Sequence, residues 1–171
     1  FTACNVFFKF TGPEILGGST VKGHEGWQEL LSYNHSFEQP TLPVSKLVGG
    51  ATTKNADRAD VALVMELDRS MPLLAKLSWT GKHIDKATLV AYRSAGDTGS
   101  AQLGAPYLKI EFESVIITHL DISGGGGGAP TVSFAVNYAK VTYTYNQQDH
   151  TKGTVGADQP VSHDLRTNEV A

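Results

Sequence analysis

Hydrophobic and polar residues alternate with a period of two along most of this chain, which is typical of half-buried β-strands. We therefore expect strands at residues 4–10, 27–38, 61–67, 86–93, 107–122 and 131–145, and a last short strand near 161–166. The alternation is clearest from 27 to 38. There we expect a buried face of Trp27, Leu31, Tyr33 and Phe37, and a solvated face of Gln28, Ser32, Asn34 and Ser36.

Two of the expected strands are unusually long and should be irregular. In the segment 107–122, apolar and polar residues alternate up to Glu113, but residues 115–117 are apolar on both faces. This pattern predicts a bend or bulge near Ser114, with the later half of the strand buried from two sides. In the segment 131–145, the phase of the apolar residues shifts after Tyr138, which predicts a second bulge.

One segment, residues 70–81, has the signals of a helix. Ser70 is a residue type that caps helix N-termini, Pro72 suits the first turn, and Gly81 suits the position after the last turn. A narrow apolar stripe would be formed by Leu73, Leu74 and Leu77. At roughly three turns the helix is too short to be stable alone, so we expect it to lie against the sheet.

The remaining segments predict loops. Residues 39–60 form a long irregular loop, the glycine run 124–128 connects two strands, and residues 146–160 are polar. We find no internal repeat, and 171 residues suit one domain with a buried core. The sequence therefore predicts a single domain over 1–171 of mainly β class, an antiparallel and closed or nearly closed structure with one helix.

Composition and charge exclude several classes of function. The net charge is −3 and Lys and Arg do not cluster, whereas a nucleic-acid-binding surface needs a basic stripe. No stretch approaches the ~20 apolar residues of a membrane-spanning helix. The first residues lack the features of a secretory signal, and because Phe1 is not an initiator Met we expect a few residues before it. The charged share of 18% is low for a free monomer and favours a surface partly covered by something other than water.

No set of residues has the spacing of a catalytic or metal site. The six histidines form no His-x-x-x-His pair, so we interpret them as loop and surface residues. Cys4 is the single cysteine, which excludes an intrachain disulfide and a cysteine metal cluster. The glycines 124–128 precede Ala129-Pro130 and a strand, rather than the Lys and helix of a phosphate-binding loop. We expect no enzymatic activity, no metal and no cofactor.

Motifs along nearly the whole chain resemble the haemolysin-coregulated protein (Hcp) family, the tube subunits of type VI secretion. The most specific is Leu67-Asp68-Arg69-Ser70-Met71-Pro72-Leu73-Leu74, which runs on to Thr80-Gly81-Lys82-His83. Further matching segments are Val6-Phe7-Phe8-Lys9-Phe10, Gly23-His24-Glu25-Gly26-Trp27 and Tyr107-Leu108-Lys109-Ile110, together with residues 115–117, 134–141 and 163–168.

The resemblance implies a two-sheet antiparallel β-barrel flanked by one short α-helix, with six subunits per ring and rings stacked into a hollow tube. In this family a contractile sheath propels the tube out of the cell, and the lumen holds and protects effector proteins. The implied partners are further copies of this chain, effectors, the spike protein and the sheath, with no nucleic acid and no membrane insertion. The implied location is the bacterial cytoplasm, followed by secretion without a signal peptide to the extracellular space or a target cell.

The resemblance also implies roles for two groups of residues. The solvated face of the 27–38 strand corresponds to the lumen wall, so candidates for effector contact are Gln28, Ser32, Asn34 and Ser36. Asn34-His35-Ser36 departs there from the family's common aromatic-glycine pattern. The extended loop 39–60 would reach an adjacent subunit or ring, with candidate contacts at Leu42, Val44, Lys46, Leu47, Val48, Lys54, Asp57 and Arg58. Residues 146–171 would form a C-terminal tail.

Two other interpretations remain open. A phage-type tail-tube protein resembles the family in fold and differs in its machine, although the Gly-Lys-His sequence at 81–83 favours the secretion family. A monomeric β-barrel binding module would form no ring and would contain a concave apolar cavity for a small molecule.

Overall fold

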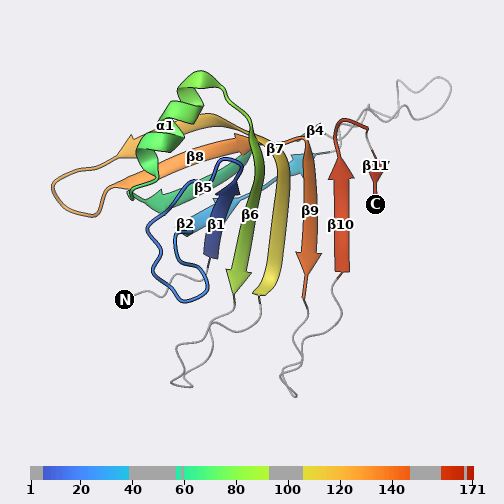
Figure 1. The fold of residues 1–171 in the computed structure, drawn as a ribbon, viewed down its shortest axis with the longest axis horizontal. Coiled ribbons are helices and arrows are strands. Elements are labelled where there is room, and N and C mark those ends of the chain that lie inside the picture. Colours follow the sequence, from blue (N-terminus) through green and yellow to red (C-terminus); the bar gives the residue numbers. More distant parts are fainter. Residues whose placement is uncertain (1–5, 39–56, 59, 93–105, 147–158, 168) are drawn as a thin grey trace, which may run out of the picture.

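The fold is that of a computed structural model, which describes residues 6–38, 57–58, 60–92, 106–146, 159–167 and 169–171 (Figure 1). Its strands are β1 (Val6–Thr11), β2 (Gln28–Asn34), β3 (Phe37–Glu38), β4 (Asp57–Arg58), β5 (Val61–Glu66), β6 (Ile84–Tyr92), β7 (Pro106–Ser123), β8 (Thr131–Asn137), β9 (Lys140–Tyr145), β10 (Gln159–Asp164) and β11 (Glu169–Val170). The helix α1 spans Met71–Thr80. The predicted mainly β class with one helix is confirmed.

The strands close into a barrel. The order β7-β6-β1-β2-β5-β8 is antiparallel throughout, and pairing of β8 with β7 completes a six-stranded ring. We call β1, β6, the first half of β7, β9, β10 and β11 sheet A, and β2, β5, β8 and the second half of β7 sheet B. The strands of sheet A run from top to bottom in Figure 1, and those of sheet B cross behind them.

Strand β7 belongs to both sheets. Residues 108–113 pair with β9, and residues 116–123 pair with β8. Between these stretches, Ser114 has a φ of 53°, a left-handed conformation that is uncommon for residues other than glycine. The predicted bend near Ser114 is therefore confirmed. Val115 and Ile117 are buried, but beyond them Thr118, His119 and residues 121–123 are exposed, so the later half is not buried from two sides as expected.

The segment 131–145 changes sheet where a bulge was predicted. Strand β8 ends at Asn137 in sheet B, and β9 begins at Lys140 in sheet A. Backbone hydrogen bonds hold the crossing point: the Ala139 N–H donates to the carbonyl of Glu113 at 2.9 Å, and the Leu165 N–H donates to the carbonyl of Ala139 at 2.8 Å. The shift in the apolar pattern after Tyr138 therefore marks the point where the chain leaves sheet B and enters sheet A.

The core lies between the two sheets and under the helix. Its centre is aromatic: the rings of Phe8 and Phe10 lie 4.8 Å apart, and Phe134 lies 6.0 Å from Phe8. The alternating apolar residues of two expected strands, 61–67 and 131–145, point into this core, and each of these side chains is buried: Val61, Leu63, Met65, Val132, Phe134, Val136 and Tyr138. Leu67, the last residue of the expected strand 61–67, follows the end of β5 and is exposed.

Helix α1 packs against β7, and its end signals differ in part from those predicted. Gly81 adopts the left-handed conformation, with a φ of 63°, as expected. The Ser70 side chain makes no capping hydrogen bond; instead, the Asp68 carboxylate accepts hydrogen bonds from the Ser70 N–H, at 2.8 Å, and from its hydroxyl. The buried stripe comprises Leu74, Ala75 and Leu77, whereas Leu73 is exposed.

Candidate functional surface

A bulge in β2 decides which of its residues face solvent. The pairing of β2 with β5 skips Leu31, which has no partner on β5. Gln28 and Leu30 are buried before the bulge, and Tyr33 packs against the core after it. The expected buried face is therefore wrong at two positions: Leu31 is 56% exposed, and Phe37, in β3, is 64% exposed.

Gln28 lies on the opposite side from the one predicted. Its side chain is fully buried, and its Nε2 donates to the backbone carbonyl of Ile15 at 3.2 Å. A side chain in this position supports the segment that precedes β2 and cannot contact another protein without rearrangement. The prediction that Gln28 shares the solvated face is wrong, whereas Ser32, Asn34 and Ser36 are exposed as expected.

The registers of sheet B align two rows of side chains on its outward face. One row crosses β2, β5, β8 and β7 at Ser32, Val64, Ser133 and Asp121. The next row contains Asn34, Ala62, Ala135 and His119. Directly opposed residues in antiparallel strands have Cβ atoms about 5 Å apart, so each row is continuous. We call these two rows the small-residue face.

The small-residue face has low relief. Apart from Asp121 and His119, its side chains are Ser, Asn, Ala and Val. All of them are exposed or half-buried, and none projects as a large apolar side chain. Another molecule can therefore approach the backbone of sheet B closely. Ser36 is exposed but lies beyond the last residue of β2, outside both rows.

Carboxylates border this face. Glu66 pairs with Thr131, one step beyond the row of Asp121. At the other border, the Thr118 hydroxyl donates to Asp60 Oδ2 at 2.6 Å. The described strands of sheet B, including residues 116–123 of β7, contain no Lys or Arg. The face and its borders therefore combine neutral and negatively charged groups.

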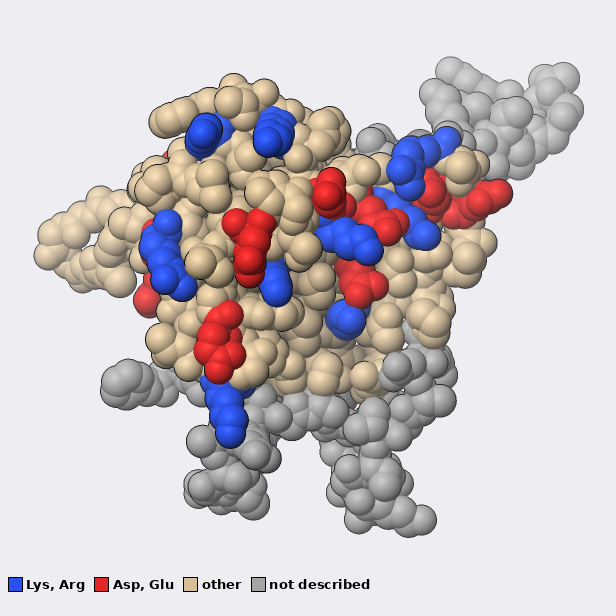
Figure 2. Space-filling view, in the orientation of Figure 1, with Lys and Arg blue, Asp and Glu red and all other residues tan. Residues whose placement is uncertain are grey.

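The outward face of sheet A has a different chemistry. Pairing aligns opposite charges in a row across β6, β7, β9 and β10, at Lys86, Glu113, Lys140 and Asp164. Ion pairs join Lys109 to Glu111 at 3.0 Å, Lys140 to Glu113 at 3.9 Å, and Arg166 to Asp164 at 3.1 Å. Figure 2 shows both charge signs interspersed over these strands. A hollow of about 240 Å³ on this face is lined mainly by charged and threonine side chains, unlike an apolar ligand pocket.

His35, which was expected to be a surface residue, joins β2 to β9. Its Nε2 lies 2.6 Å from the Tyr138 hydroxyl, and its Nδ1 is hydrogen-bonded to the Tyr143 hydroxyl. The ring stacks on Tyr143 at a centroid distance of 5.6 Å and meets Phe37 edge-on. Burial lowers the pKa of His35 and raises the pKa of Tyr143, so both are neutral at neutral pH.

His24 is a second histidine that is not on the surface. It stacks on Phe7 at 4.5 Å, and its Nε2 lies 2.7 Å from the Tyr92 hydroxyl. Burial lowers its pKa, too. No spacing in the sequence marks either position, because the hydrogen-bond partners Tyr143, Tyr138 and Tyr92 lie at least 68 residues away in the chain.

Of the candidate contacts in the extended loop, only Asp57 and Arg58 lie within the described residues. Strands β3 and β4 pair through Phe37 with Arg58 and Glu38 with Asp57, so the two ends of the segment 39–56 lie side by side. Asp57 and Arg58 are thereby placed in a strand. The other candidates, Leu42, Val44, Lys46, Leu47, Val48 and Lys54, lie outside the described residues, as does Cys4. The expected tail 146–171 contains β10 and β11, which extend sheet A.

Among the described residues, no group of three or more His, Cys, Asp or Glu side chains is arranged to hold a metal ion. Likewise, the described part of the chain contains no helix that is long and apolar enough to cross a membrane.

The described elements form a closed barrel of crossed antiparallel sheets, with a flanking helix and a lateral extension of sheet A. A family model described as "Type VI secretion system effector, Hcp" matches residues 7–145. The chain belongs to the Hcp family, and the resemblance drawn from the sequence is confirmed.

Solved structures share this fold. A type six secretion system protein matches with a TM-score of 0.85 and 23% identity, covering 99% of this chain and 100% of that one. Hcp1 from Salmonella typhimurium matches with a TM-score of 0.75 and 23% identity, covering 97% of each chain. A type VI secretion system effector from Yersinia pestis matches with a TM-score of 0.70 and 23% identity, covering 93% of this chain and 98% of that one. No protein with a curated description matches this chain in sequence.

Proposed function

We propose that this chain is the subunit of a type VI secretion inner tube. Six copies form a ring, the rings stack, and the resulting tube carries effector proteins toward target cells. Assembly takes place in the bacterial cytoplasm and the tube is then secreted, with effectors, the spike protein and the sheath as partners. In this role the chain binds other proteins and catalyses no reaction.

The observation that carries the proposal is the small-residue face. A channel that passes different proteins needs a wall without deep pockets or large apolar side chains, because such features would hold one cargo too tightly. Short side chains at Ser32, Ala62 and Ser133 meet this requirement. We therefore assign the small-residue face to the lumen, with Ser32 and Asn34 in contact with effectors. Ser36 would lie at its border.

The pairing of β3 with β4, at the two ends of the extended loop, supports a role of this loop in ring stacking. Because β3 and β4 fix the two ends of the segment 39–56 to each other, the segment can be shortened without cutting the barrel. We expect deletion of residues 42–56 to weaken ring stacking while the barrel stays folded. Sedimentation of tubes, compared with circular dichroism of the same sample, measures both properties. If the deletion variant forms tubes as readily as the wild type, the loop does not contribute to stacking.

The proposal is tested by the solution mass across a concentration series. Light scattering should find a stable species near six times 18.3 kDa, and electron microscopy should show rings. A monomer at every concentration would refute the tube and favour the monomeric binding module.

A variant pair tests the lumen assignment. Asn34→Arg places a bulky charge on the small-residue face, whereas Thr80→Arg places it on an exposed position of α1. Both variants should form rings of normal mass, because neither site is buried. Only Asn34→Arg should lose effector retention in a pull-down on assembled rings. Equal retention by the two variants would contradict the assignment.

A further inference from the structure

We infer that the small-residue face selects effectors by charge, and that its cargo is a folded protein with a surface rich in Lys and Arg. The inference rests on the proposed function, because it takes this face to be the lumen wall. It adds the chemical class of the cargo, which membership of the family does not specify.

The first step is the position of the carboxylates. Asp121 lies in a row of the small-residue face, and Glu66 lies one step further along, on the far side of β8. Strand spacings of about 4.8 Å and a step of about 7 Å along the strand place the two carboxylates roughly 12 Å apart. Both side chains are exposed. Their separation is close to the screening length of about 8–10 Å at physiological salt, so a cargo surface lying on the face senses both charges.

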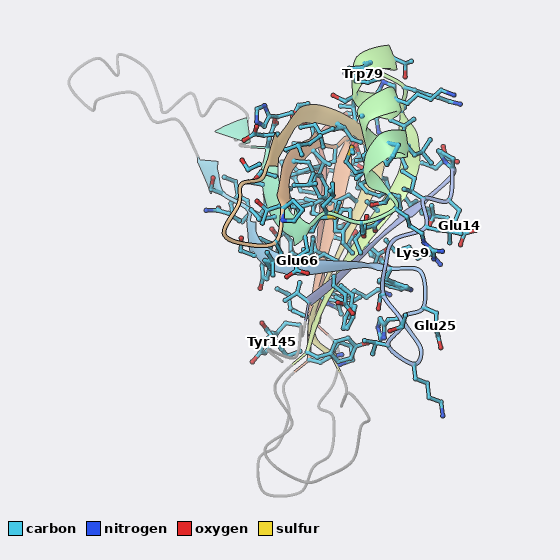
Figure 3. The ribbon with its side chains drawn as sticks, turned by 90° about the vertical axis from the view of Figure 1, so that its left-hand side faces the viewer. Lys9, Glu14, Glu25, Glu66, Trp79 and Tyr145 are labelled. Carbon is cyan, nitrogen blue, oxygen red and sulfur yellow. The ribbon has the colours of Figure 1, made fainter. Side chains whose placement is uncertain are left out.

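The second step is the lack of compensating charge. On the outward face of sheet A, Glu111, Glu113 and Asp164 each have a Lys or Arg partner within 4.0 Å. Sheet B offers no such partner, because its described strands contain no Lys or Arg. Asp60 adds a carboxylate at the border, where the Thr118 hydroxyl donates to it. Figure 3 shows Glu66 apart from Lys9, Glu14 and Glu25, which lie together at another side of the barrel.

The third step is geometry. When six copies surround a channel, their uncompensated carboxylates face one enclosed volume, and walls of low dielectric constant concentrate the field there. The intervening Ser, Ala and Val side chains are too short to hold a cargo away from the wall. Lys and Arg on the cargo are long enough to reach Glu66 and Asp121, and Arg can bind a carboxylate through two parallel hydrogen bonds. An acidic cargo would meet repulsion without any attractive partner.

The experiment uses assembled rings and two versions of one small helical domain, carrying net charges of about +6 and about −6. Fluorescence anisotropy measures the Kd of each version at about 0.1 M and about 0.5 M salt. At low salt the cationic version should bind at least tenfold tighter than the anionic one, a difference of about 1.4 kcal/mol. At high salt the difference should shrink.

A variant pair ties this preference to the face. The double variant Glu66→Gln/Asp121→Asn should lose it, and Glu14→Gln/Glu25→Gln, which changes the net charge equally at exposed sites elsewhere, should keep it. Equal binding of the two probes by wild-type rings would overturn the inference and leave the tube intact. Persistence of the preference in Glu66→Gln/Asp121→Asn would also overturn it. Failure of the wild-type chain to form rings would overturn the proposed function and, with it, this inference.

Discussion

Replacing His35 with Phe should destabilise the fold by about 2 kcal/mol. The substitution keeps an aromatic ring that can stack on Tyr143 and meet Phe37, but it removes the hydrogen bonds to the hydroxyls of Tyr138 and Tyr143. A typical intramolecular hydrogen bond contributes about 1 kcal/mol net. Tyr138 is only 5% exposed, so its hydroxyl would be left without this partner in a site that excludes most water. His35→Ala also removes the ring contacts and should cost about 1 kcal/mol more.

Urea unfolding at one fixed protein concentration measures this effect, because the proposed ring assembly would make apparent stability depend on concentration. A double-mutant cycle of His35→Phe with Tyr143→Phe should give a coupling energy of about 1 kcal/mol, since each variant removes the same hydrogen bond. His119→Gln serves as the control: His119 is exposed, so its replacement should change stability by less than about 0.5 kcal/mol. If His35→Phe changes the free energy of unfolding by no more than this control does, with an unchanged m-value, the reasoning is refuted.

Three further outcomes follow from the structure. Stability should fall as the pH decreases below about 6.5, because burial lowers the pKa of His24 and His35 and the unfolded chain then binds more protons than the folded one. The urea midpoints at about pH 7.5 and about pH 5.5 measure this effect, and a higher midpoint at the lower pH would contradict it. Phe134→Ala should cost about 3–5 kcal/mol in urea unfolding, since the ring is buried against Phe8; a loss below about 1 kcal/mol would show that the core is not packed as described. Gly17→Ala should cost about 1–3 kcal/mol in the same assay, because the new Cβ would lie 2.4 Å from the backbone oxygen of Trp27; wild-type stability would mean that this approach is loose.

Periodicity predicts the strands of this protein well where one ladder continues without interruption. Val61, Leu63 and Met65 alternate strictly, pair regularly with β8, and point inward as the pattern indicates. The same pattern assigns the wrong face to Gln28, because the bulge at Leu31 reverses the alternation halfway along β2. A bulge adds one residue against an unchanged partner strand, so its position depends on the partner and is not encoded in the strand's own alternation.

The change of sheet after Tyr138 and the position of His35 both depend on long-range contacts. The shift after Tyr138 is visible in the sequence, but only the positions of β7 and β9 show that it is a change of sheet. At Ser70 the reason is local: its residue type suits a cap, but its hydroxyl donates to the Asp68 carboxylate, which also accepts from the Ser70 N–H. His35 could not be assigned from spacing, because its partners lie more than 100 residues away in the chain.

The double membership of β7 has a mechanical consequence. In the tube proposed above, a force on the exterior of the subunit would be resisted by cargo on its interior. In this fold the two sheets share one continuous backbone through Ser114, so displacement of one sheet pulls on the other through covalent bonds as well as through side-chain packing. The strands on either side of the bend cross in Figure 1, so a pull along the strands of one sheet loads its hydrogen bonds in shear, where several must break together. The barrel should therefore deform as a unit when it is pushed.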